Sequence, residues 1–183
     1  MAARWLWSRL LVPSLLLFAP VSPAAAADPD YRRFFGEYVG EAVSGDSGRV
    51  ETRDISAKIG PAPKGFTVSW LMNIHRISGK EKHVEYSMTF LPTKRDNIYS
   101  AAMALDAFGN AVPLDPMKGD PYVWARIEGQ TLTLYALTVT ERGGYDLQVF
   151  DRKLVPGGME LRYSRVVDGQ APRVITGRLK KVR

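Results

Sequence analysis

The feature that most constrains the fold of this chain is the regular spacing of its turn-forming residues. From residue 44 onward, breaks that contain glycine or proline recur after about eight to twelve residues, and the segments between them are rich in Val, Ile, Thr, Tyr and Phe. Such segments are typical of β-strands joined by short turns. We count about ten of them, whereas only residues 28–35 favour a short helical segment at the N-terminal end. The sequence therefore predicts an all-β protein.

Apolar and polar residues alternate within these segments, which gives each strand two distinct faces. The alternation places Trp70 and Tyr86 on apolar faces that point to the interior, and it assigns Tyr145, Leu147 and Val149 to the apolar face of a later strand. A long antiparallel meander leaves no unpaired edge when its first and last strands pair. We therefore predict a single-domain, up-and-down antiparallel β-barrel of about eight to ten strands.

An outer-membrane barrel is the structural alternative, because it is also built from alternating strands of about ten residues. Its outward face would be an apolar band flanked by aromatic residues. In this chain one face of most segments is charged or hydroxylic, and the terminal stretch GRLKKVR contains no aromatic residue. The pattern favours a barrel with an apolar interior and a polar exterior.

Residues 1–27 have the layout of a secretory signal peptide. Two arginines precede the apolar run 10–18, and the alanines at 25–27 form a suitable cleavage site. The run is too short to span a bilayer, so we expect cleavage and a mature β-barrel domain over residues 28–183, with no transmembrane segment. The chain contains no cysteine, which excludes thiol nucleophiles and thiolate metal sites. These features favour a periplasmic protein.

The charge of the chain is mildly basic. It carries 25 Lys and Arg against 19 Asp and Glu, a formal net charge of +6, and loss of the two leader arginines leaves +4. Stretches such as KRD and DRK intersperse both signs, so no nucleic-acid partner is expected. The basic run at residues 177–183 leaves weak contact with anionic envelope lipid open.

The only two histidines, His75 and His83, flank Gly79. A turn centred on Gly79 would pair them on the polar, outward face, where neither ring reaches the interior. Together with Glu85 they offer three ligands and no enclosing shell, so an adventitious surface zinc or nickel pair is the alternative to two solvated side chains. We predict no metal site and no cofactor.

The stretch GDSG, residues 45–48, matches the segment around a trypsin-like nucleophilic serine. That chemistry needs a histidine base, which in that fold precedes the serine, and no histidine precedes Ser47. The same four residues are typical of a hairpin turn. We therefore predict no catalytic residues and a protein that is not an enzyme.

Arginines that alternate with aromatic residues form the candidate ligand site. If Trp124 and Arg126 on one strand and Tyr163 and Arg165 on another face inward, their guanidinium groups can bind a carboxylate or phosphate while aromatic rings contact an acyl tail. Alternatively, both arginines lie at the rim, or acids such as Asp106 or Asp151 pair with them. The predicted ligand-binding residues are Arg126, Arg165, Tyr163, Trp124, Trp70 and Tyr86.

The mature chain resembles the calycin superfamily, which includes lipocalins, fatty-acid-binding proteins and nitrobindin-like barrels. The lipocalin Gly-x-Trp motif corresponds to Gly36-Glu37-Tyr38, with Tyr in place of Trp, and the resemblance implies that a late basic residue, Arg178, packs on this ring. Fatty-acid-binding proteins hold a carboxylate with an Arg-x-Tyr element, and residues 163–165 present the same types in reverse order.

Two functions are consistent with the sequence. The first is a non-catalytic periplasmic binding protein for a small apolar or anionic amphiphilic molecule held in the barrel. The second is an envelope interaction module, such as an inhibitor or assembly factor, with a filled barrel and functional loops. An interior cavity larger than about 300 Å³ would favour the first.

Overall fold

The computed structural model describes residues 30–46, 49–75, 79, 81–105, 108, 111–112 and 114–183. The predicted signal peptide, residues 1–27, lies outside the described residues, as does Ser47 of the GDSG stretch.

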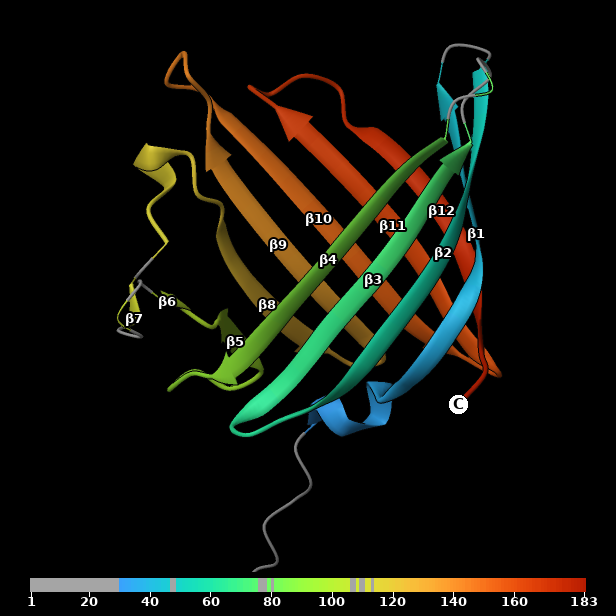
Figure 1. Ribbon diagram of the computed structural model, residues 1–183, viewed down its shortest axis with the longest axis horizontal. Coiled ribbons are helices and arrows are strands. Elements are labelled where there is room, and N and C mark those ends of the chain that lie inside the picture. Colours follow the sequence, from blue (N-terminus) through green and yellow to red (C-terminus); the bar gives the residue numbers. More distant parts are fainter. Residues whose placement is uncertain are drawn as a thin grey trace, which may run out of the picture.

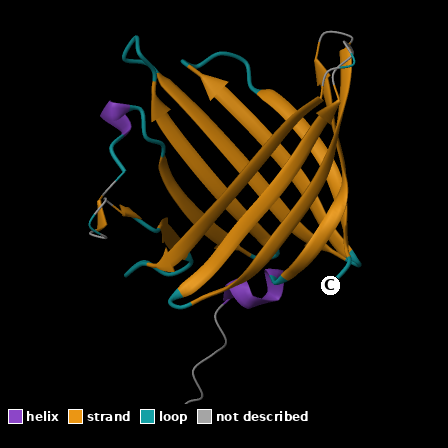
Figure 2. Ribbon diagram, viewed as in Figure 1, coloured by secondary structure: helices purple, strands orange, loops and turns teal. Residues whose placement is uncertain are grey.

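Ten antiparallel strands close into one barrel (Figures 1 and 2). Neighbours in sequence pair around the barrel, and the last strand pairs with the first, so the predicted all-β, single-domain, up-and-down barrel is confirmed. The barrel strands are β1 (Gly36–Asp46), β2 (Arg49–Ala62), β3 (Gly65–His75), β4 (Glu81–Pro92), β5 (Ile98–Ala101), β8 (Tyr122–Glu128), β9 (Thr131–Val139), β10 (Tyr145–Val155), β11 (Gly158–Val167) and β12 (Arg173–Lys181).

One excursion interrupts the meander between β5 and β8. It contains the two-stranded pair β6 (Ala104–Leu105) and β7 (Ala111–Val112) and the 3₁₀ helix η2 (Pro116–Lys118), and it lies beside the barrel wall (Figure 1). Asp115 caps η2, because its Oδ1 accepts a hydrogen bond of 3.0 Å from the backbone N–H of Met117. Along the described parts of the chain, no helix has the length and apolar character that a membrane span needs.

A second 3₁₀ helix, η1 (Asp30–Phe34), lies across one end of the barrel (Figure 2). Phe34 is fully buried there, and inward-facing aromatic residues of the neighbouring strands fill this end: the rings of Phe66 and Phe90 stack with centroids 5.3 Å apart. Tyr31 of η1 stacks on Phe66 at 5.0 Å. This end of the barrel, below called the closed end, is therefore a packed hydrophobic core.

Tyr38 anchors the first strand at the closed end. Its ring is fully buried, and its hydroxyl donates a hydrogen bond of 2.8 Å to the carbonyl of Phe34. The resemblance to lipocalins implies that Arg178 packs on this ring, but Arg178 is exposed on the outer face. Lys181 takes that place, with its Nζ 5.8 Å from the ring centroid, because Lys181 is the register partner of Tyr38 and points inward.

The β3–β4 hairpin confirms the predicted faces but not the predicted partners. His75 lies opposite Glu81, and Asn73 opposite His83, so the register differs by two residues from a turn centred on Gly79. A shift of two residues keeps every side chain on its own face. Trp70 and Tyr86 therefore point inward, as predicted, and both histidines point outward.

In β10 the predicted face is wrong. Phe150 and Arg152 point inward, while Tyr145, Leu147 and Val149 lie on the outer face. Both faces of this strand carry large apolar residues, so alternation alone does not choose between them. Pairing with β9 decides the orientation, because Phe150 lies opposite Leu134, which is buried in the core.

The outer face of most strands carries charged residues in ion pairs. Lys58 and Glu37 approach to 3.0 Å across β2 and β1, and Arg162 of β11 lies 3.7 Å from Asp151 of β10. A barrel that spans a membrane presents a continuous apolar band instead.

Candidate ligand-binding cavity

The half of the barrel opposite η1 is hollow. Its cavity has a volume of about 520 Å³ and opens at the end of the barrel where residues 82, 121 and 173 lie. The apolar part of its lining consists of Ala42, Ile55, Ala57, Trp70, Met72, Ile74, Val84, Met88, Val123, Ala136, Phe150, Leu161 and Ile175.

The cavity exists because small inward-facing residues replace the large ones of the closed end. Ala42, Ala57 and Ala136 point into the barrel and line the cavity. At the closed end, by contrast, Phe66 and Phe90 meet directly. Large inward side chains thus fill the closed end of the barrel, and smaller ones leave the other end open.

Four aromatic rings form a continuous chain of contacts along the cavity wall. Trp70 lies 5.2 Å from Tyr86 and 5.6 Å from Phe150, and Phe150 lies 4.9 Å from Tyr163. β3 and β10 are not neighbours in the sheet, so the contact between Trp70 and Phe150 crosses the lumen. These two rings form the cavity floor.

Arg152 is buried at this floor, with only 4% of its surface exposed. Its Cζ lies 5.0 Å from the ring centroid of Trp70 and 5.9 Å from that of Phe150, which is cation–π geometry. Within the described part of the chain, neither Nε nor Nη1 of Arg152 has a hydrogen-bond partner. Burial lowers the pKa of Arg152 to about 10, so the side chain remains a cation at neutral pH.

The remainder of the polar lining is mostly cationic. Five of the described lining residues are cationic and lie on inward strand faces: Arg53, Lys82, Arg152, Arg165 and Arg173. Arg162 and Asp151 also border the cavity, but their side chains pair with each other on the outer face. Arg53 of β2 is buried like Arg152, with 5% exposed. Cationic groups in a low-dielectric hollow attract anions. They also repel one another, so the interior is less stable when no anion is bound.

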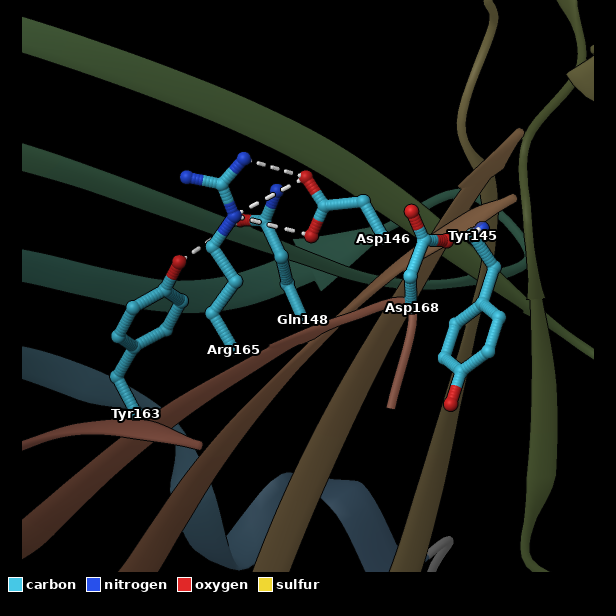
Figure 3. A network of polar contacts seen from close by, with 6 residues as sticks. All are labelled: Tyr145, Asp146, Gln148, Tyr163, Arg165 and Asp168. Carbon is cyan, nitrogen blue, oxygen red and sulfur yellow. Dashed lines mark hydrogen bonds and ion pairs between the residues drawn. The ribbon is translucent and has the colours of Figure 1, made fainter. Parts of the chain in front are cut away.

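A network of polar contacts lies at the open end (Figure 3). Arg165 donates to both carboxylate oxygens of Asp146, at 2.6–3.0 Å, and this pair raises the pKa of Arg165. Tyr163 donates a hydrogen bond of 3.2 Å to Gln148, and burial raises the pKa of Tyr163, so its phenol stays protonated. The guanidinium of Arg165 is thus already paired with the carboxylate of Asp146 in the same chain.

The predicted ligand-binding residues divide between the two sides of the wall. Trp70, Tyr86, Tyr163 and Arg165 line the cavity, and their role in binding stays a prediction.

Trp124 and Arg126 do not face the cavity. In β8 the buried, inward residues are Val123, Ala125 and Ile127, which places the alternate residues outside. Trp124 stacks on Tyr135 with centroids 4.7 Å apart, and Arg126 pairs with Glu128 at 2.8 Å. The condition on which the predicted ligand-binding role of Trp124 and Arg126 depended, that both face inward, is therefore not met.

Arg152 and Arg53 are the candidate residues that sequence reasoning missed. Arg152 lies two residues after Phe150, so both occupy one face of β10. The apolar residues Tyr145, Leu147 and Val149 favoured the other face as the inward one. The sequence does contain a signal for Arg53 in β2. Arg53 alternates with period two on the same strand face as Ile55, Ala57 and Ile59, which indicates that it points inward.

The histidines form a small exposed cluster outside the barrel. His75 Nε2 lies 2.8 Å from Asp54, and its Nδ1 lies 3.2 Å from Glu81; the hydrogen bond with Asp54 is the main cause of the raised pKa of His75. His83 contacts Asn73 at 2.6 Å. Neither ring lines the cavity.

A second hollow of about 1440 Å³ lies on the outer face, over β1 and β8–β12. Its lining is largely charged and hydroxylic, and it includes Glu41, Arg162 and Arg178, together with the exposed Val43. This trough is separated from the cavity by the barrel wall.

Comparison with protein-family models finds no match, and a search of curated proteins finds none either. Among solved structures, the chain is similar to the S-type phycobiliprotein lyase CPES from Guillardia theta. The two share 9% sequence identity with a TM-score of 0.49, over 84% of this chain and 89% of that chain.

Proposed function

We propose that this protein is a non-catalytic binding protein that holds a small amphiphilic molecule inside its barrel. The observation that carries the proposal is the interior cavity of about 520 Å³ with its apolar and aromatic wall. Ligand cavities in proteins begin at roughly 300 Å³ and combine such walls with a few polar groups. A filled interior would instead have favoured the interaction-module hypothesis.

The finer parts of the proposal are a calycin-like protein, export to the periplasm and the absence of catalysis. A closed meander around an interior cavity supports the first, and the layout of residues 1–27 supports the second. The third is supported by the position of His75 and His83, the residues best suited to acid–base chemistry at neutral pH, on the outer face away from the cavity.

An envelope interaction module remains the second candidate function. The outer trough favours it, as do the exposed apolar side chains of the excursion, where Met103 is 53%, Phe108 91% and Met117 79% exposed. Exposed apolar residues that gather in one segment are typical of docking sites.

Two substitutions separate these candidates. Ala136→Trp places an indole in the cavity, whereas Val43→Trp places one in the outer trough, where Val43 is 44% exposed. We expect Ala136→Trp to weaken binding of the neutral fluorescent probe phenylnaphthylamine by at least about tenfold, because it occupies the ligand volume. Val43→Trp should leave the affinity within about twofold, since surface changes rarely propagate through a packed wall.

Equal affinity in wild type and Ala136→Trp would contradict binding in the cavity. Native mass spectrometry of the protein purified without denaturation provides a second measurement. We expect a bound small molecule in the wild type that is lost from Ala136→Trp and retained by Val43→Trp.

A further inference from the structure

We propose that Arg152 forms an anion-binding site at the floor of the cavity and that the ligand enters head first, with an oxyanion on Arg152 and its apolar body toward the open end. This inference rests on the proposed function and adds the chemical class and the orientation of the ligand.

The donors of Arg152 carry the argument. A guanidinium presents five N–H donors in a plane, and buried polar groups nearly always have hydrogen-bond partners. Nε and Nη1 of Arg152 have none among the described residues, although the side chain is 4% exposed and lines an open cavity. These two atoms lie on different edges of the guanidinium, so one acceptor atom cannot satisfy both, whereas an anion with several oxygens, assisted by a water, can.

The surroundings of Arg152 hold the charge in place but do not neutralise it. The rings of Trp70 and Phe150 lie with their centroids within 6 Å of the guanidinium carbon, which fixes the position of the guanidinium in the cavity lining. The lowered pKa of Arg152, about 10, follows mainly from burial. An incoming oxyanion would replace the lost hydration with charge-assisted hydrogen bonds.

A comparison of Arg152 with Arg165 indicates which end of the ligand lies deep in the cavity. Arg165, near the open end, already donates to both oxygens of Asp146, whereas Arg152 at the floor has donors to spare. Arg53 adds a second buried cation to the same interior. The strongest attraction for an anion therefore lies deep in the cavity, and the chain of rings from Phe150 to Tyr163 is positioned to contact the apolar body above it.

Two probes with the same aromatic body test the inference. Anilinonaphthalene sulfonate carries an oxyanion, and phenylnaphthylamine is its neutral counterpart. Fluorescence titrations compare wild type with Arg152→Met, which keeps the apolar stem and removes the charge, and with Arg126→Met, the same change on the outer face. We expect Arg152→Met to weaken sulfonate binding by about tenfold or more, the effect of losing hydrogen bonds to a charged group. Its affinity for the neutral probe, and both affinities of Arg126→Met, should stay within about twofold.

The possible outcomes separate this inference from the proposed function. An unchanged sulfonate affinity in Arg152→Met would overturn the anion site and leave the binding function intact. Failure of the wild type to bind either probe would overturn both. If Arg152→Met loses both probes, Arg152→Gln is titrated in its place: selective loss of the sulfonate supports the site, and equal loss of both probes overturns it.

Discussion

At the scale of single residues, Arg152 is a cation that folding alone disfavours. Burial removes water from the guanidinium and lowers its pKa from the ordinary range of arginine to about 10, a penalty on the order of 3 kcal/mol. Cation–π contacts with Trp70 and Phe150 return about 2 kcal/mol in a desolvated setting, and Nε and Nη1 still lack hydrogen-bond partners among the described residues. A side chain retained under such conditions is more easily explained by what it binds than by what it stabilises.

We therefore expect Arg152→Met to raise the free energy of unfolding of the ligand-free protein, by about 1–3 kcal/mol at pH 7. Above pH 10 the folded wild type releases the proton of Arg152 while the unfolded chain still holds it. The unfolded state then binds more protons, so wild-type stability rises with pH and the advantage of the variant shrinks. Urea unfolding of both proteins at pH 7 and near pH 11 measures this difference. A variant less stable than wild type at pH 7 would show that Arg152 supports the fold.

At the scale of elements, glycines allow the backbones of β1, β12 and β11 to approach one another closely where the barrel closes. A Cβ added at Gly158, the first residue of β11, would overlap the carbonyl oxygen of Leu179 on β12. A Cβ at Gly40 of β1 would likewise overlap the carbonyl oxygen of Arg178. Glycine permits such approach because it has no side chain, so these positions help β1, β12 and β11 to curve around the closed end.

Gly158→Ala should destabilise the protein by about 1–3 kcal/mol, because the backbone of β12 must move to admit the methyl group. Gly60→Ala is the matched control: Gly60 also lies in a barrel strand, and a Cβ there meets nothing within 4 Å. That change should be neutral or stabilise by up to about 1 kcal/mol through the unfolded state. Thermal unfolding followed by circular dichroism compares them, and equal effects would contradict the packing argument.

At the scale of the whole molecule, the closed sheet joins every strand to two neighbours. β1 pairs with both β2 and β12, so no strand of the barrel can leave without breaking two ladders. The aromatic core at one end also contacts strands from both halves of the chain. A barrel connected in this way behaves as one cooperative unit.

We expect one unfolding transition for the mature protein. Trp70 reports on the interior and Trp124 on the outer wall, and circular dichroism reports on the strands. In a urea titration the fluorescence and dichroism curves should share one midpoint. Separate midpoints would mean that part of the wall unfolds before the rest.

The sequence alone was sufficient for the fold class and for several strand faces. Turn-forming residues and period-two alternation are local properties, so they predict strands and the inward direction of Trp70 and Tyr86 without knowledge of the neighbours. The position of the histidines outside the barrel follows from the same alternation. The partners of His75 and His83 were wrong by two residues, because hairpin register depends on the length of the loop.

Only the tertiary structure decided which faces of β8 and β10 point inward and whether the interior is hollow. Both strands carry large apolar residues on both faces, so the choice between Trp124 and Val123, or between Leu147 and Phe150, depends on pairing with neighbouring strands and on closure of the whole sheet. The cavity volume is a sum over side chains from nine strands, and no local pattern encodes such a sum. Arg152 becomes a candidate anchor only when its position beneath Trp70, across the lumen, is known.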